Sequence, residues 1–308
     1  MVPVLIDTDP GIDDALALLL AFRAPGWRVE ALTVVAGNVP VDVGVRNVAR
    51  ILRAVGPPAL PRVAIGPAGP RARPLVTATY FHGEDGLGGV SAQFPEAPLD
   101  RYPGDAADLL LASAQRWPGE LTIVMLGPLT NLAAAIDRNR EVLRRARAVV
   151  VMGGAVGVPG NVTPAAEYNV FVDPEAAALV LAADLPLTLV PLDVTREVLW
   201  PADRVERLRG AGGPAGRFAY TVARAGLHGQ GSAERAALTM HDPLAVGVAL
   251  DPTLVETEVV RLTVETASTV NRGKTAMASG GSRCRVALRV DAERFLRRYE
   301  ESLWPACA

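Results

Sequence analysis

The first sixteen residues combine a short apolar run, a Pro-Gly break and four aspartates. The apolar run is rich in β-branched residues and predicts a buried strand. Pro10 and Gly11 then interrupt the chain, and residues 12–22 have the apolar content of a buried helix, whose first turn tolerates proline. In open α/β sheets, ligands bind where such strands end and their helices begin. Four carboxylates are expected to gather at this junction: Asp7, Asp9, Asp13 and Asp14.

Four carboxylates in so little space repel one another. Two like charges about 5 Å apart repel by about 3 kcal/mol at an effective dielectric constant near 20. A nearby helix N-terminus stabilises each carboxylate by only about 0.3–1 kcal/mol. A shared proton or a bound cation would relieve the remainder, and clustered oxygen ligands suit Ca²⁺ or Mg²⁺. Asp is also a common helix cap, but capping needs one aspartate, so four indicate a site.

Strand-like and helical stretches alternate over most of the 308 residues. After the opening strand, strands are expected at 31–36, 62–66, 121–126, 148–152 and 187–191, and again at 255–265, 269–278 and 284–290. Helices are expected at 12–22, 41–55, 105–117, after residue 131 to about 145, at 174–183, in two stretches between 201 and 229, and at 292–303. This alternation predicts one α/β domain over residues 1–308, with a mainly parallel, Rossmann-like central sheet flanked by helices.

Two segments need separate mention. Residues 66–104 are rich in Pro and Gly, and long irregular segments of this kind are usually functional or mobile. Asp242 is expected to be the N-cap of one more helix, with Pro243 just inside it.

Composition excludes several classes of protein. The net charge of −2 offers no electrostatic basis for binding nucleic acid or an anionic membrane. No apolar run approaches twenty residues, so no membrane span is expected. Cys284 and Cys307 make no disulfide framework, and the N-terminus lacks the pattern of a signal peptide. A reducing cytoplasm is therefore the expected location.

Acids and amides recur just after predicted strands or at predicted helix starts. These residues are Asp7, Asp9, Asp13, Asp14, Asn38, Asn161, Glu167, Asn169 and Asp242. A site rich in carboxylates and carboxamides suits a neutral polyhydroxylated ligand together with a divalent cation. A phosphate site would instead need Lys, Arg or a glycine-rich cradle.

The opening motif, Asp7-Thr8-Asp9-Pro10-Gly11-Ile12-Asp13-Asp14-Ala15, resembles the signature of the inosine–uridine-preferring nucleoside hydrolases. Further motifs match in order along the chain: Gly37-Asn38, His82-Gly83, Gly127-Pro128-Leu129-Thr130-Asn131, Met152-Gly153-Gly154, Asn161, Glu167-Tyr168-Asn169, Asp173-Pro174-Glu175-Ala176-Ala177 and His241-Asp242-Pro243. The resemblance implies hydrolysis of a ribonucleoside to ribose and free base. It also implies the nucleoside hydrolase fold, one tightly bound Ca²⁺, and a homodimer or homotetramer.

The resemblance also assigns roles to residues. It implies that Asp9, Asp14 and Asp242 bind Ca²⁺ through carboxylates and Leu126 through its carbonyl, and that Asp9 is the general base for a calcium-bound water. Asp7 is expected to lie outside these direct ligands. The ribose hydroxyls and the 5′-hydroxymethyl group would be held by Asp13, Asn38, Met152, Asn161, Glu167, Asn169 and Asp242.

On the side of the base, the resemblance implies that His241 protonates the departing base and that His82 faces it. Histidine at both positions is similar to the pyrimidine-accepting or nonspecific branch of the family. Residues 224–233 depart from the family because they are small and glycine-rich. This segment is expected to be mobile and to order over substrate.

Two other classes of protein fit parts of the sequence. A non-catalytic sensor of ribose or nucleosides could use the same scaffold, although every metal position and water-activating position is filled. A phosphatase similar to the haloacid dehalogenases would explain Asp7-x-Asp9. It would also require a downstream lysine with an acidic motif after it, which Lys274 does not provide.

Overall fold

Strands from the whole length of the chain join one sheet. The computed structural model describes residues 1–210, 212–229 and 235–303. Within these residues the sheet has ten strands in the order β11-β10-β12-β7-β6-β5-β1-β2-β3-β4. Their bounds are β1 Val2–Thr8, β2 Trp27–Val34, β3 Arg62–Ile65, β4 Asp100–Arg101, β5 Thr122–Met125, β6 Ala148–Met152, β7 Leu187–Val190, β10 Val255–Val264, β11 Thr275–Met277 and β12 Ser282–Val290.

The sheet is mostly parallel, as the alternation of strands and helices predicts. Every pairing from β12 through β7 and across to β4 is parallel. At the other edge, β10 runs antiparallel to both β12 and β11. A separate antiparallel ribbon pairs β8 (Leu199–Pro201) with β9 (Ala237–Thr239).

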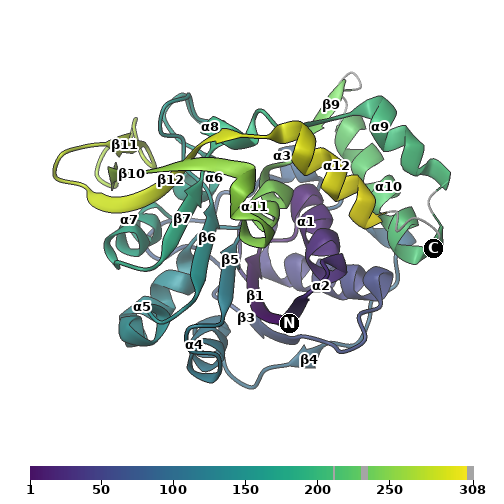
Figure 1. The fold of residues 1–308 in the computed structure, drawn as a ribbon, viewed down its shortest axis with the longest axis horizontal. Helices are drawn as coiled ribbons and strands as arrows, with labels where there is room; N and C mark the ends of the chain where they lie inside the picture. The colour runs from purple at the N-terminus through teal and green to yellow at the C-terminus, as the bar shows by residue number, and fades with distance from the viewer. Residues whose placement is uncertain (211, 230–234, 304–308) are drawn as a thin grey trace.

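Helices cover both faces of the sheet (Figure 1). One layer contains α1 (Ile12–Arg23), α2 (Val41–Val55), α10 (Gly213–His228), α11 (His241–Leu250) and α12 (Ala292–Leu303), which pack around α1. The opposite layer contains α4 (Ala106–Arg116), α5 (Thr130–Leu143) and α7 (Pro174–Ala182). The shorter helices are α3 Thr79–His82, α6 Tyr168–Val172, α8 Leu192–Thr195 and α9 Ala202–Glu206, with 3₁₀ turns at Ser91–Gln93, Arg207–Gly210 and Pro252–Leu254.

Successive residues of the central strands supply two separate hydrophobic cores. Val4 and Ile6 of β1 pack into the layer that contains α1, while Leu5 between them packs into the layer that contains α4. This division follows from the two-residue period of a strand. All three side chains are fully buried, as expected for a parallel strand covered on both faces.

The strand order reverses at β1, and this reversal places the site. The chain proceeds from β1 to β2 and β3 on one side, while β5, β6 and β7 lie on the other. The connections therefore diverge at the carboxyl end of β1 and leave a crevice there, which is where open α/β sheets bind ligands.

The structure corrects several boundaries. Helix α11 starts at His241 with Met240 as its N-cap, so the prediction that Asp242 is the N-cap was wrong. Only Thr275–Met277 of the strand expected at 269–278 pairs in the sheet. The two helical stretches expected between 201 and 229 are confirmed as α9, extended by a 3₁₀ turn, and α10, although residue 201 itself ends β8.

Some expectations concern residues outside the described ranges. Residues 224–228 form the end of α10, whereas 230–234 of the glycine-rich segment are outside those ranges, as is Cys307. Cys284 is buried and makes no disulfide within the described chain. None of the described helices has the length and apolar character needed to cross a membrane.

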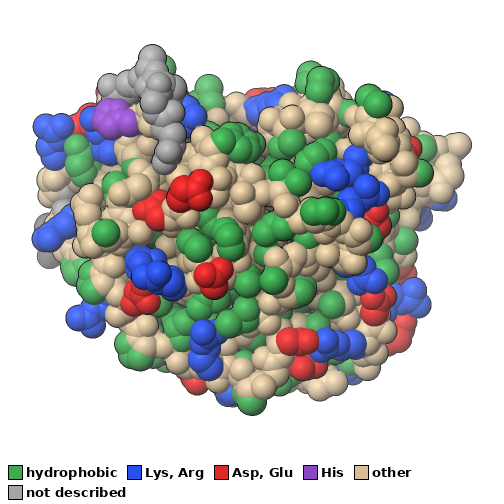
Figure 2. Space-filling view, turned by 180° about the vertical axis from the view of Figure 1, so that it is seen from behind, with side chains coloured by type: hydrophobic (Ala, Val, Ile, Leu, Met, Phe, Trp, Pro, Cys, Tyr) green, Lys and Arg blue, Asp and Glu red, His purple; other side chains and the backbone are tan. Residues whose placement is uncertain are grey.

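Acidic and basic side chains are interspersed on the face shown in Figure 2, with apolar atoms between them. No broad field of one charge covers this face, which agrees with the net charge of −2. The broad, positively charged surface that binds nucleic acid is therefore not seen on this face.

Candidate active site

A cavity of about 220 Å³ lies at the carboxyl end of the central strands. Of the residues proposed from the sequence, its walls include Asp13, Asn38, His82, Leu126, Met152, Asn161, Glu167, Asn169, His241 and Asp242. Asp9 and Asp14 do not line the cavity and are buried, but both accept hydrogen bonds from Asn38, which does. The fold therefore brings together residues that are far apart in the sequence.

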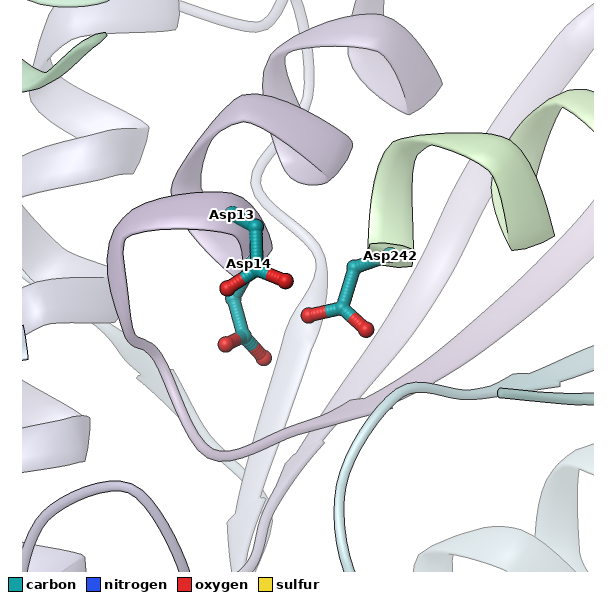
Figure 3. Close-up of side chains that lie close together, drawn as sticks. All are labelled: Asp13, Asp14 and Asp242. Atoms are coloured by element: carbon teal, nitrogen blue, oxygen red, sulfur yellow. The ribbon is translucent and has the colours of Figure 1, made fainter. Parts of the chain in front are cut away.

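Three aspartates form a compact oxygen cluster. Asp13 and Asp14 come from the first turn of α1 and Asp242 from the first turn of α11, and their side chains point toward one another (Figure 3). One carboxylate oxygen from each lies within 4.8 Å of the others. This cluster includes Asp13, to which the family resemblance assigned a role in binding the sugar. It does not include Asp9.

Asp14 is held by four donors. Its Oδ1 accepts hydrogen bonds from Thr8 Oγ1 at 2.6 Å and from the Asp9 amide at 3.2 Å. Its Oδ2 accepts from the Gly11 amide at 2.9 Å and from Asn38 Nδ2 at 3.0 Å. These bonds fix the orientation of the carboxylate.

Asp9 is less well compensated. Its Oδ2 accepts a hydrogen bond of 2.7 Å from the Asn38 amide, whereas its Oδ1 is buried without a hydrogen-bond partner among the described residues. Burial and the nearby charge of Asp14 raise the pKa of Asp9 well above its ordinary value. Glycines at positions 37 and 127 allow this carboxylate to fit, because a Cβ at either would lie within 2.4 Å of one of its oxygens.

The carboxylates of Asp13 and Asp242 are also disfavoured as anions. Burial and the charge of Asp14 raise the pKa of Asp13 to about 7. Burial and the charges of Asp13, Asp14 and Asp9 raise the pKa of Asp242 well above its ordinary value. A divalent cation would reverse this penalty, since a nearby positive charge favours the carboxylate form. Buried carboxylates, one of them with an unpartnered oxygen, fit a hard cation such as Ca²⁺.

The amides and the glutamate on the opposite wall are held by backbone groups. Asn169 Nδ2 donates to the carbonyl oxygens of Leu126 at 2.6 Å and Met152 at 3.2 Å. The Glu167 carboxylate caps α6 by accepting hydrogen bonds from the amides of Asn169 and Val170. It also accepts one from the Gly154 amide. The Asn161 side chain accepts a hydrogen bond of 2.9 Å from the Tyr168 amide.

Two imidazoles lie on another part of the wall. His82 Nδ1 accepts a hydrogen bond of 3.0 Å from the Ile12 amide, and His241 Nδ1 lies 2.7 Å from Thr195 Oγ1. Burial lowers the pKa of each histidine to about 4. Both rings are therefore neutral at physiological pH in this structure.

The structure adds residues that the sequence did not indicate. Tyr168, Leu238 and Thr239 line the cavity, and Thr195 contacts His241 from outside it. Thr195 is the last residue of α8, the short helix that follows β7, and this place beyond the carboxyl end of a strand was the available signal. Asp7 does not line the cavity, because its Oδ2 accepts hydrogen bonds from Thr33 and Asn131 below it.

Comparison with known proteins agrees with this geometry. Residues 4–297 match the family described as inosine-uridine preferring nucleoside hydrolase. The pyrimidine-specific ribonucleoside hydrolase RihA of Citrobacter koseri is 37% identical over 277 residues, which are 89% of this chain and 88% of that protein.

Solved structures give the same result. A plant nucleoside hydrolase, PpNRh1, superposes with a TM-score of 0.88 at 31% identity and 98% coverage of both chains. A purine-preferring ribonucleoside hydrolase from Gardnerella vaginalis superposes with a TM-score of 0.90 at 29% identity, also with 98% coverage of both. The family match covers the Asp7-x-Asp9 motif, so this motif is explained without the phosphatase alternative. The chain therefore belongs to the inosine-uridine preferring nucleoside hydrolase family and is a nucleoside hydrolase, an enzyme that cleaves N-glycosyl bonds.

Proposed function

We propose that this enzyme accepts pyrimidine ribonucleosides and hydrolyses them to ribose and free base with Asp9 as the general base. The observation that carries this proposal is one cavity with buried carboxylates and amides on some walls and His82 and His241 on another. The pyrimidine-specific relative from Citrobacter koseri supports the choice of base.

The proposed Ca²⁺ ligands are the carboxylates of Asp9, Asp14 and Asp242 and the carbonyl oxygen of Leu126. When bound, the cation would orient a water molecule and lower its pKa. Asp13 lies in the same oxygen cluster, so it would add negative charge beside the cation as well as contact the sugar.

Asp9 is proposed to take the proton of the attacking water. Its Oδ2 is fixed by the Asn38 amide, while Oδ1 has no partner among the described residues and is the atom free to accept a proton. Burial and the nearby charge of Asp14 raise the pKa of Asp9 above its ordinary value, which makes its carboxylate a stronger base than an exposed one.

The remaining walls are proposed to hold the sugar. Asp13, Asn169 and Asp242 would bind the 2′- and 3′-hydroxyls, and Asn38 would support them. The 5′-hydroxymethyl group would lie among Met152, Asn161 and Glu167. Side chains fixed by backbone hydrogen bonds, as Asn169 and Glu167 are, position the sugar with little loss of entropy.

The base would leave toward His241 and His82. As the C1′–N bond breaks, its electron pair moves onto the base. The His241 ring would donate a hydrogen bond to the base at that stage. Apolar and aromatic walls from Phe81, Tyr168 and Leu238 offer a surface for a planar base.

Free-ribose release from uridine, cytidine, inosine and adenosine tests this function. The wild type should release ribose fastest from the pyrimidine nucleosides, and Asp9→Ala should abolish release. Asp42→Asn, an exposed change in α2, is the matched control and should retain wild-type rates. Binding of nucleosides by calorimetry without ribose release would point to a sensor instead.

The oligomeric state is a further part of the proposal. The family precedent supports a homodimer or homotetramer. Light scattering of the purified protein would distinguish these assemblies from a monomer.

A further inference from the structure

His241 is hydrogen-bonded to the buried hydroxyl of Thr195. Thr195 is fully buried, and its Oγ1 lies 2.7 Å from His241 Nδ1. Within the described residues, this ring nitrogen is the only hydrogen-bond partner of the hydroxyl. A buried hydroxyl that does not donate its proton costs free energy, so its proton must point at a lone pair on His241 Nδ1.

We propose that Thr195 is a positioning residue that holds His241 in the tautomer with its proton on Nε2, aimed at the leaving base. Nδ1 accepts from Thr195 and so carries no proton, which leaves Nε2–H as the donor available to the cavity. This inference rests on the proposed function, because it concerns the same leaving-group side of the site.

Both partners are held in place by the fold. Thr195 is the last residue of α8, and the Leu192 amide of this helix donates a hydrogen bond to the Gly154 carbonyl. This bond holds the helix against the end of β6. His241 follows β9, which pairs with β8, and the Met240 amide donates to the Val198 carbonyl at 3.0 Å. Since β8 lies only a few residues after Thr195, this ribbon sets the distance between the hydroxyl and the ring.

His82 reaches the same tautomer by a different route. The Ile12 amide can only donate, so His82 Nδ1 must accept and its proton must also be on Nε2. The cavity thus presents two imidazole N–H donors and no imidazole acceptor. The group recognised there is an electron-rich edge of the base, such as a carbonyl oxygen or an unprotonated ring nitrogen.

This arrangement defines the role of His241 in the reaction. The water oxygen forms the new bond to C1′ and its proton goes to Asp9, while the electron pair of the C1′–N bond goes to the base. The Nε2–H of His241 hydrogen-bonds to the base as that charge develops. Solvent then supplies a proton to the base and removes the one on Asp9, so the overall change is the addition of one water.

Thr195→Val and Thr195→Ser test the proposal. Valine keeps the shape and removes the hydroxyl, whereas serine keeps the hydroxyl. The chain has only three histidines, so ¹⁵N-labelled histidine with His228→Gln and His82→Gln variants assigns the ring signals. The wild type and Thr195→Ser should show His241 protonated at Nε2, and Thr195→Val should show a mixture of tautomers.

Kinetics provide the second measurement. In Thr195→Val, kcat for uridine should fall about tenfold with KM changed less than about twofold, and Thr195→Ser should restore the rate. The loss should be smaller for a nitrophenyl riboside, whose leaving group needs no donor.

Two results would overturn the proposal: an unchanged His241 spectrum in Thr195→Val, or equal losses in the serine and valine variants. Failure of the proposed function would look different. In that case the wild type would release no ribose, while the ring nitrogens would still report the tautomer.

Discussion

Replacement of Gly37 by alanine should displace Asp9 and slow catalysis without changing any ligand. A Cβ at position 37 would lie 2.1 Å from Asp9 Oδ2 and 2.8 Å from both Asp9 Cγ and Pro128 Cδ. Because favourable non-bonded separations are about 3.5–4.0 Å, the carboxylate would have to move by about 1 Å or more.

The size of the effect follows from the bond that is lost. The displaced Oδ2 would no longer accept the 2.7 Å hydrogen bond from the Asn38 amide. A hydrogen bond to a charged group contributes about 1.5–3 kcal/mol, and each 1.36 kcal/mol is about tenfold in rate. A misplacement of about 1 Å can itself cost about 100-fold, so kcat/KM for uridine should fall by about 100-fold.

Ribose release measures this loss, and circular dichroism shows whether the variant is folded. Gly280→Ala is the matched control, because a Cβ there would meet no atom within 4 Å. If Gly37 acts through Asp9, Gly37→Ala should add almost nothing to Asp9→Asn in the double variant. A Gly37→Ala enzyme within about threefold of the wild-type kcat/KM would refute the reasoning.

Three further predictions concern the metal, the aspartates and the C-terminal helix. In chelator, stability should fall as the pH rises from about 5 to about 7.5, because carboxyls with raised pKa must lose protons that unfolded aspartates lose near 3.9. Added Ca²⁺ should raise the melting temperature more at the upper pH than at the lower, since protons compete for the same oxygens. Asp14→Asn should lose both activity and stability because it replaces one of two oxygens, each of which accepts from two donors, by an NH₂ group. Asp9→Asn in chelator should lose activity and melt no lower than the wild type. Glu300→Ala should lower the free energy of unfolding by about 2 kcal/mol in urea titrations, because the Nε1–H of fully buried Trp200 loses its 2.9 Å acceptor.

Long periodic elements could be predicted from the sequence because local signals agree with the fold. Helix α2 runs from Val41 to Val55 as expected, after Pro40 and before Gly56, which adopts the left-handed cap. The closing helix Ala292–Leu303 also has its expected bounds. These signals depend on neighbours in sequence, which a single chain displays.

Other features depend on contacts that local patterns do not contain. Residues 269–278 alternate like a strand, yet only Thr275–Met277 pairs, because β10 is the partner and its register ends there. Asp242 is a residue type favoured at N-caps, but the N-cap of α11 is Met240, two residues earlier. The cavity is lined mainly by residues of the recognised motifs, whereas Leu238 of β9 joins its wall, and Thr195 of α8 contacts His241 from outside it, through packing that no motif indicates.

The compact cluster of Asp13, Asp14 and Asp242 has a consequence for how the enzyme is made. The ribosome completes Asp14 early and Asp242 only 228 positions later (242 − 14). A nascent chain that stops before α11 has the first two carboxylates but lacks the third. Closing so long a loop is slow, and it cannot occur until about four fifths of the chain has been made. The complete cluster therefore requires a chain that extends through α11, and translation products truncated before α11 should gain no protection from proteases when calcium is present.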